Sequence, residues 1–90
     1  MVHKVVKNNK DAVVFGDKFI VNVTKGNEFL EVKDATGKVT EKLGFTVTLD
    51  EFEKANGGRF TDVQYGYMTK KARDRRFNWL VSNMAKDRRI

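Results

Sequence analysis

The alternation of apolar and polar side chains between residues 39 and 49 constrains the fold more than any other feature. The apolar members occupy odd positions and are Val39, Leu43, Phe45, Val47 and Leu49. Successive side chains of a strand point to opposite faces, so this period of two predicts a strand with one apolar face. Glu41 is the only charged residue on that face, which places it near an edge or an end. Gly44 predicts a bulge or a bend where the sheet curls.

Other runs rich in β-branched and aromatic residues predict further strands around this one. They cover residues 2–7, 12–15, 19–24, 28–33 and 59–68. Turns at residues 8–11, 16–18, 25–27 and 34–37 are indicated by Asn, Asp and Gly. Connections of hairpin length imply mainly antiparallel pairing. With no proline and no linker, we expect one domain over residues 1–90.

Two helices complete the predicted fold. Thr48 and Glu51 have the spacing of a capping box, which predicts a short helix near residues 49–55 that ends at Gly57 and Gly58. A second helix is expected over residues 69–90, where apolar side chains recur at helical spacing and should face the core. They are Phe77, Leu80, Val81 and Met84. The expected class is therefore α+β: a curled antiparallel meander of four to five strands with a short helix and a basic amphipathic C-terminal helix.

The last 22 residues, Thr69 to Ile90, carry the whole net charge of the chain. They hold eight basic and two acidic side chains, whereas the full chain of 90 residues holds 18 and 12. The first 68 residues therefore keep ten of each and are formally neutral. Such asymmetry is typical of contact with a polyanion.

Trp79 sharpens this prediction because it projects from the side of the second helix opposite the apolar stripe, among cations. An indole gains little by facing water unless something covers it. The candidate nucleic-acid-binding residues are Lys70, Lys71, Arg75, Arg76, Trp79, Lys86 and Arg89, with Tyr65 and Tyr67 from the preceding strand. We expect the cations to follow phosphates while Trp79 stacks on an unpaired base. RNA is favoured over duplex DNA, because only Asn78 and Asn83 on this helix are of the amide type that reads base edges.

Tyr65-Gly66-Tyr67 resembles the aromatic–glycine–aromatic centre of the RNP motif in RNA-recognition modules, where sheet aromatics stack on bases. The resemblance covers three residues. The expected order of elements departs from the βαββαβ module, because at least three strands precede any helix. The resemblance therefore assigns no family, and a tyrosine that completes the core below the helix is the competing interpretation.

Two hypotheses of other classes use the same helix. In the first, the chain is a small phage-type inhibitor or antitoxin-like adaptor that docks on a host RNA-processing enzyme or toxin, alone or within an RNA–protein complex. In the second, the Trp79 face closes a homodimer, which pairs two segments of charge +6 and needs an intervening anion or an offset geometry.

Catalysis, metal binding and membrane insertion find little support in the sequence. His3 is the only histidine and lies near the N-terminus, cysteine is absent, and no carboxylate pair has ligand spacing. We therefore expect no enzyme, metal or cofactor; the one catalytic alternative is a histidine-free nuclease built on lysine, tyrosine and a carboxylate. No apolar run approaches the ~18 residues that span a bilayer, and a cytoplasmic location is expected.

Overall fold

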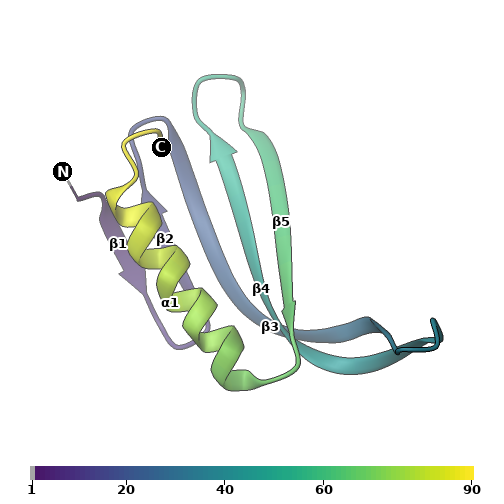
Figure 1. Ribbon diagram of the computed structural model, residues 1–90. Coiled ribbons are helices and arrows are strands. Elements are labelled where there is room, and N and C mark those ends of the chain that lie inside the picture. Colours follow the sequence, from purple (N-terminus) through teal and green to yellow (C-terminus); the bar gives the residue numbers. More distant parts are fainter. Residues whose placement is uncertain (1) are drawn as a thin grey trace.

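Five antiparallel strands and one helix form the protein in a computed structural model that describes residues 2–90 (Figure 1). The elements are β1 (Lys4–Lys7), β2 (Asp11–Phe15), β3 (Phe19–Lys33), β4 (Val39–Glu53), β5 (Arg59–Tyr67) and α1 (Lys70–Lys86). The strands lie in the sheet in chain order, so each of the four connections between strands is a hairpin. The predicted α+β class and antiparallel meander are confirmed.

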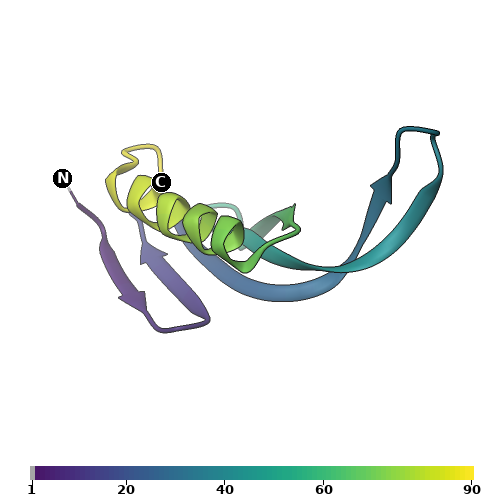
Figure 2. The ribbon, with the colours of Figure 1, turned by 60° about the horizontal axis from the view of Figure 1, so that its bottom comes forward.

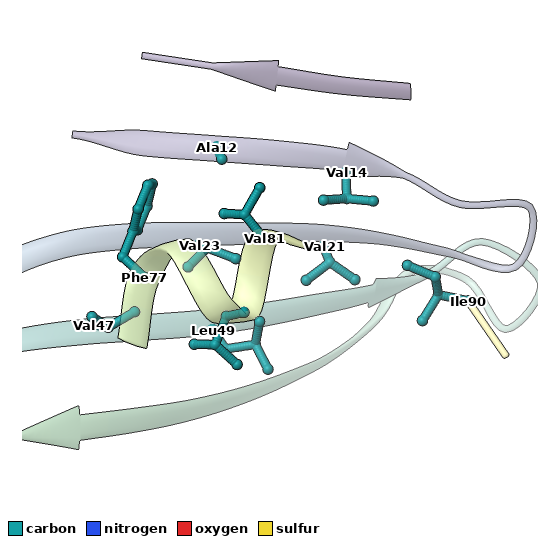
Figure 3. Packing of buried hydrophobic residues seen from close by; sticks show 10 residues of the cluster. Ala12, Val14, Val21, Val23, Val47, Leu49, Phe77, Val81 and Ile90 are labelled. Carbon is teal, nitrogen blue, oxygen red and sulfur yellow. The ribbon is translucent and has the colours of Figure 1, made fainter. Parts of the chain in front are cut away.

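The core lies between α1 and one face of the sheet, which we call the helix side. Its buried strand residues are Ala12, Val14, Val21, Val23, Val47 and Leu49, and its buried helix residues are Phe77, Leu80 and Val81. The register brings the strand residues together, because Val23 pairs with Ala12 on β2 and with Leu49 on β4. Phe77 and Val81 project from α1 toward these side chains (Figure 3). The predicted apolar stripe is confirmed, with Met84 partly buried at its margin.

The strands β3 and β4 extend well beyond the rest of the sheet. They pair with each other from Phe19–Glu53 to Lys33–Val39, whereas β2 reaches only Thr24 on β3 and β5 only Phe45 on β4. Residues 28–33 and 39–44 therefore form a two-stranded ribbon, which we call the arm, and Figure 2 shows it curving away from the sheet.

The predicted turn at residues 25–27 is wrong. Lys25, Gly26 and Asn27 pair with residues 45–47 in the middle of β3. Pairing with a long neighbour overrides the local turn preference of Gly and Asn. Gly26 instead contributes to the packing of α1, because its backbone carbonyl accepts a hydrogen bond from Arg73.

The close approach of Leu30 explains the glycine at position 44. The register between β3 and β4 runs through Gly44 without an extra residue, so a bulge is absent there. A Cβ at this position would clash with Cδ1 of Leu30. Gly44 therefore allows the Leu30 side chain to fold over the strand where the arm leaves the sheet.

The predicted short helix at residues 49–55 is also wrong. These residues continue β4 to Glu53 and then form the turn to β5. Thr48 and Glu51 have the capping-box pattern, but residues 49–53 also pair with strands on both sides. The hydrogen bonds of two strand pairs stabilise the extended form more than a short isolated helix, which is costly to nucleate. Gly57 and Gly58, with φ of 69° and 81°, serve this hairpin turn and do not cap a helix.

Both described ends of the chain pack against the fold. The His3 side chain is buried, with Nε2 2.7 Å from the carbonyl oxygen of Asp87, and its backbone N–H donates to the carbonyl of Ala85. The helix ends at Lys86, before the predicted boundary, and the Ile90 side chain is buried. The carbonyl of Ile90 accepts from the N–H of Phe19 at 2.8 Å. These contacts fix the C-terminal end of α1 on the sheet.

Candidate nucleic-acid interface

The helix α1 begins where Thr69 caps it. The hydroxyl of Thr69 accepts a hydrogen bond from the N–H of Ala72 at 3.2 Å, which satisfies one of the free donors of the first turn. From this start the chain crosses the sheet with Phe77 inward, and the same rotation turns Ala72, Arg76 and Trp79 toward β5.

Arg73 anchors this helix and is only 6% exposed. Its Nη1 donates to the carbonyl of Gly26 at 3.0 Å, and its Nε donates to Oδ1 of Asp74 at 2.7 Å. The guanidinium also lies 5.4 Å from the ring centre of Phe45. This cation is therefore committed to the fold, although the sequence counts it in the basic segment.

An open groove of about 550 Å³ lies between α1 and β5. It is lined by Tyr67, Ala72, Arg75, Arg76 and Trp79. The small side chain of Ala72 leaves room between the two elements, and the part of the chain that the structure describes places no carboxylate in the lining. Ala72 is not among the residues predicted from the sequence, although its position one turn before Arg76 on the Trp79 side was a usable signal.

Arg76 lies at the centre of an aromatic cluster beside this groove. Its Nε donates to the hydroxyl of Tyr67 at 2.7 Å. Its guanidinium carbon is 5.2 Å from the ring centre of Tyr65 and 5.1 Å from that of Trp79, within the range of cation–π attraction. Within residues 2–90 its two terminal nitrogens make no hydrogen bond. The cluster holds the cation in place while its outer edge stays available.

The three predicted aromatics differ in burial. Trp79 is 53% exposed, which confirms that the indole is accessible. Tyr65 is partly buried and packs against the core, as the competing interpretation expected of at least one tyrosine. Tyr67 is partly buried at the wall of the groove.

The remaining predicted cations lie outside this groove. Lys70 lines a second hollow of about 610 Å³ on another side of α1, together with Lys10, Lys25 and Asp74 among others. Lys71 and Lys86 are exposed. Arg89 lies beyond the helix, where its Nη2 is 2.8 Å from Oδ2 of Asp87. The groove and its aromatic cluster thus bring together Tyr65, Tyr67, Arg75, Arg76 and Trp79, whereas the groove lining does not include Lys70, Lys71, Lys86 and Arg89.

Both acidic residues of the C-terminal segment are engaged with neighbouring cations. The hydrogen bond from Arg73 and the charge of Lys25, whose Nζ is 3.4 Å from Oδ1, hold the pKa of Asp74 below its usual value. Hydrogen bonds from the side chain and backbone of Arg89 lower the pKa of Asp87 from 3.8 to about 2. Neither carboxylate is among the residues that line the groove between α1 and β5.

Two further properties of residues 2–90 concern metal ions and membranes. Residues 2–90 contain no group of three or more His, Asp or Glu side chains placed to hold a metal ion. Over the same residues, α1 lacks the length and apolar character that a bilayer-crossing helix needs. Comparison of the chain with models of protein families, with curated proteins and with solved structures gave no match.

Proposed function

We propose that the protein is a noncatalytic domain that binds single-stranded RNA in the groove between α1 and β5. The observation that carries this proposal is the placement of Arg76 among three aromatic side chains, one of which is a half-exposed tryptophan. A guanidinium and aromatic rings at one open surface are the combination that binds phosphate and stacks on bases.

The residues of the aromatic cluster have two roles, because Arg76 provides the charge for a phosphate and Trp79 provides the ring for stacking. Tyr65 and Tyr67 orient Arg76 before any ligand arrives, so a phosphate that meets its terminal nitrogens costs little ordering entropy. Trp79 has one ring face toward Arg76 and more than half of its surface in solvent. An unpaired base that stacks on it contributes about 1–3 kcal/mol.

Cations continue this surface along the helix. Arg75, Trp79 and Lys86 lie within about 40° of one another around the helix axis and span roughly 16 Å along it. A single strand that follows this line meets cations on both sides of Trp79. This is the sense in which α1 acts as a basic amphipathic helix.

Sequence specificity should be low. Of the two amides on α1, Asn83 donates to the carbonyl of Trp79 and Asn78 accepts from Lys7. Both side chains already form hydrogen bonds within the protein, so stacking and phosphate contact are the main contributions to the binding free energy. Neither contribution depends strongly on which base is bound.

Fluorescence anisotropy of a labelled single-stranded RNA of about 12 nucleotides tests the proposal over a salt series. Arg75→Ala combined with Arg76→Ala should weaken binding and lower the slope of log affinity against log salt by roughly 1.4, since each phosphate contact to a single strand contributes about 0.7. The control is Lys38→Ala combined with Lys42→Ala, which removes the same charge from the arm and from the turn that joins its two strands. Equal losses in both double variants, or binding indifferent to salt, refute the proposal.

The arm supports a second candidate function, the docking of a protein with a cationic surface. Phe29 lies opposite Leu43, and both are largely exposed, at 70% and 60%. Glu31 lies opposite Glu41, and like charges in this position destabilise a strand pair. An isolated two-stranded ribbon is marginally stable in water. A partner that covers the apolar pair and neutralises the glutamates would stabilise it.

An RNA-processing enzyme has the required chemistry, because it carries cations where its own substrate binds. An inhibitor or adaptor of phage type would use the arm in this way. Capture of such an enzyme on the immobilised protein, with and without nuclease treatment, separates this candidate from RNA binding. Capture should survive nuclease, be lost in Glu31→Lys combined with Glu41→Lys, and persist in Trp79→Ala. Loss after nuclease, or insensitivity to the glutamate changes, excludes it.

A further inference from the structure

The outer edge of β5 is a long strand edge without protection. Within residues 2–90, β5 pairs only with β4, over nine residues from Phe45–Tyr67 to Glu53–Arg59. Its outward backbone groups are left as a template for another strand. The opposite edge differs, because β1 has four residues and carries Lys4 and Lys7 at its ends. Short length and lysine are the usual means of protecting an edge, and β5 has neither, nor a proline or a bulge.

Apolar side chains are exposed on both faces of this edge strand. Phe60 is 61% exposed on the open side of the sheet, which α1 does not cover, and Val63 is 41% exposed on the helix side. Met68, just beyond the strand, is 49% exposed. Exposed apolar surface that continues from one face of a sheet edge to the other indicates an interface.

We propose that a second copy of this chain pairs with β5 in antiparallel fashion, about a two-fold axis that passes through Val63. A two-fold symmetric antiparallel pair keeps the same side of the sheet upward in both copies, so one residue must lie on the axis. Only with Val63 on the axis do all nine residues of β5, from Arg59 to Tyr67, find a partner.

Side-chain chemistry favours the same register. Asp62 then lies opposite Gln64 of the second copy, whose amide keeps a free N–H because only one bond, to Glu28, occupies it. A shift that places Asp62 on the axis would instead oppose two aspartates, which is destabilising. Burial and, to a lesser extent, the charge of Asp62 already raise the pKa of Asp50, its neighbour on β4. A hydrogen bond from the Gln64 amide of the second copy to Asp62 would reduce the repulsion between these two carboxylates.

The remaining pairs are complementary on both faces. Phe60 comes to lie opposite Gly66 of the second copy, where the Leu30 side chain already covers the glycine, so the phenyl ring packs against Leu30. On the helix side, Arg59 lies opposite Tyr67 and Val63 opposite its own counterpart. The result is a ten-stranded sheet with both α1 helices on one side.

This inference goes beyond RNA binding and does not depend on it. Where RNA binding also holds, the two grooves face the same side of the joined sheet, with β5 and its counterpart as the floor between them. A bound polyanion would then offset the repulsion between the two basic helices.

Cysteine cross-linking tests the register directly, because the chain has no cysteine of its own. Val63→Cys should form a covalent dimer under mild oxidation at micromolar concentration, whereas Thr61→Cys or Tyr65→Cys alone should not. A mixture of those two variants should form the mixed dimer, since residues 61 and 65 face each other across the axis. Phe29→Cys in the arm, which is more exposed than Val63, is the control for random collision.

Light scattering completes the test without any cysteine. The parent chain should be a dimer, and Val63→Lys, which places two like charges on the axis, should be a folded monomer with unchanged circular dichroism. A parent chain that stays monomeric up to about 100 µM overturns the proposal, and so does Val63→Cys that cross-links no faster than Phe29→Cys. If dimers cross-link only through Phe29→Cys, the contact between copies lies at the arm, and the proposed pairing of β5 is also overturned.

Discussion

The two sides of α1 make opposite use of the same kinds of residue. Toward β2 and β3, Phe77 is fully buried and Arg73 is tied to a backbone carbonyl and a carboxylate. Toward β5, Trp79 is half exposed, and Arg76 contacts aromatic rings and one hydroxyl while its outer edge faces the groove. Arg76 lies three positions after Arg73, yet Arg73 holds the fold while Arg76 is available to a ligand. Charge counted along a sequence therefore overstates the charge that a partner meets.

Replacement of Phe77 by alanine should have the largest effect on the core-facing side. The side chain is fully buried among strand residues, and the loss of a phenyl group from such a site costs about 3–5 kcal/mol of unfolding free energy. Denaturant unfolding followed by circular dichroism measures it. At temperatures where the variant remains folded, its RNA affinity should match that of the parent chain. A loss below about 1 kcal/mol would mean that α1 is not packed as described.

Replacement of Arg73 by alanine should lower stability by about 1.5–3 kcal/mol, because charged hydrogen bonds to Gly26 and Asp74 are lost. The matched change on the other side is Arg76→Ala, which should cost less stability and more RNA affinity. Unfolding curves and RNA titrations of both variants give a two-by-two comparison. If both arginines change the same quantity by the same amount, the two sides of α1 are not distinct.

Replacement of Trp79 by alanine should leave unfolding within about 0.5 kcal/mol of the parent chain, as expected for an exposed position. RNA affinity should fall by about 1–3 kcal/mol, the range for the loss of one stacked base. Trp79→Phe should restore part of the affinity. A strong loss of stability with unchanged affinity would assign the indole to the fold.

The smallest effect concerns pH and the end of α1. The folded pKa of Asp87 is about 2, below the unfolded value near 3.8, so its contribution to stability is present above about pH 4 and is lost as pH falls toward 2. Asp87→Asn should be less stable than the parent chain at pH 7, and this difference should shrink toward pH 2. Thermal unfolding at several pH values measures it, with Asp17→Asn in an exposed turn as the control. A difference that does not change with pH contradicts the assignment.

The sequence predicted the elements whose pattern is long and agrees with their packing. The alternation from Val39 to Leu49 covers about five periods of two residues, and the stripe from Phe77 to Met84 covers about two helical turns. Both are observed. Predictions from short local patterns were wrong where pairing with neighbouring strands stabilises the chain more than the local turn or cap would. Lys25-Gly26-Asn27 and the Thr48–Glu51 box each have local turn or cap chemistry, but neighbouring strands supply more hydrogen bonds.

Part of the candidate site was also within reach of the sequence. The helical projection placed Trp79 opposite the core, and the same projection places Arg73 four residues before Phe77, inside the apolar stripe. The burial of Arg73 was therefore predictable. Its hydrogen bond to Gly26 was not, because that contact requires β3 to continue through residues 25–27 without a turn. The closeness of Tyr65 and Tyr67 to Arg76 likewise depends on how α1 crosses β5, which no local pattern specifies.

Emission from Trp79 offers the most direct test of the groove, because it is the only tryptophan in the chain. Titration with a single-stranded RNA should quench the emission along the same saturation curve that the anisotropy of labelled RNA follows, and added salt should reverse both signals together. RNA that binds without any change in the emission of Trp79 would contradict the account, since the ligand would then occupy another surface.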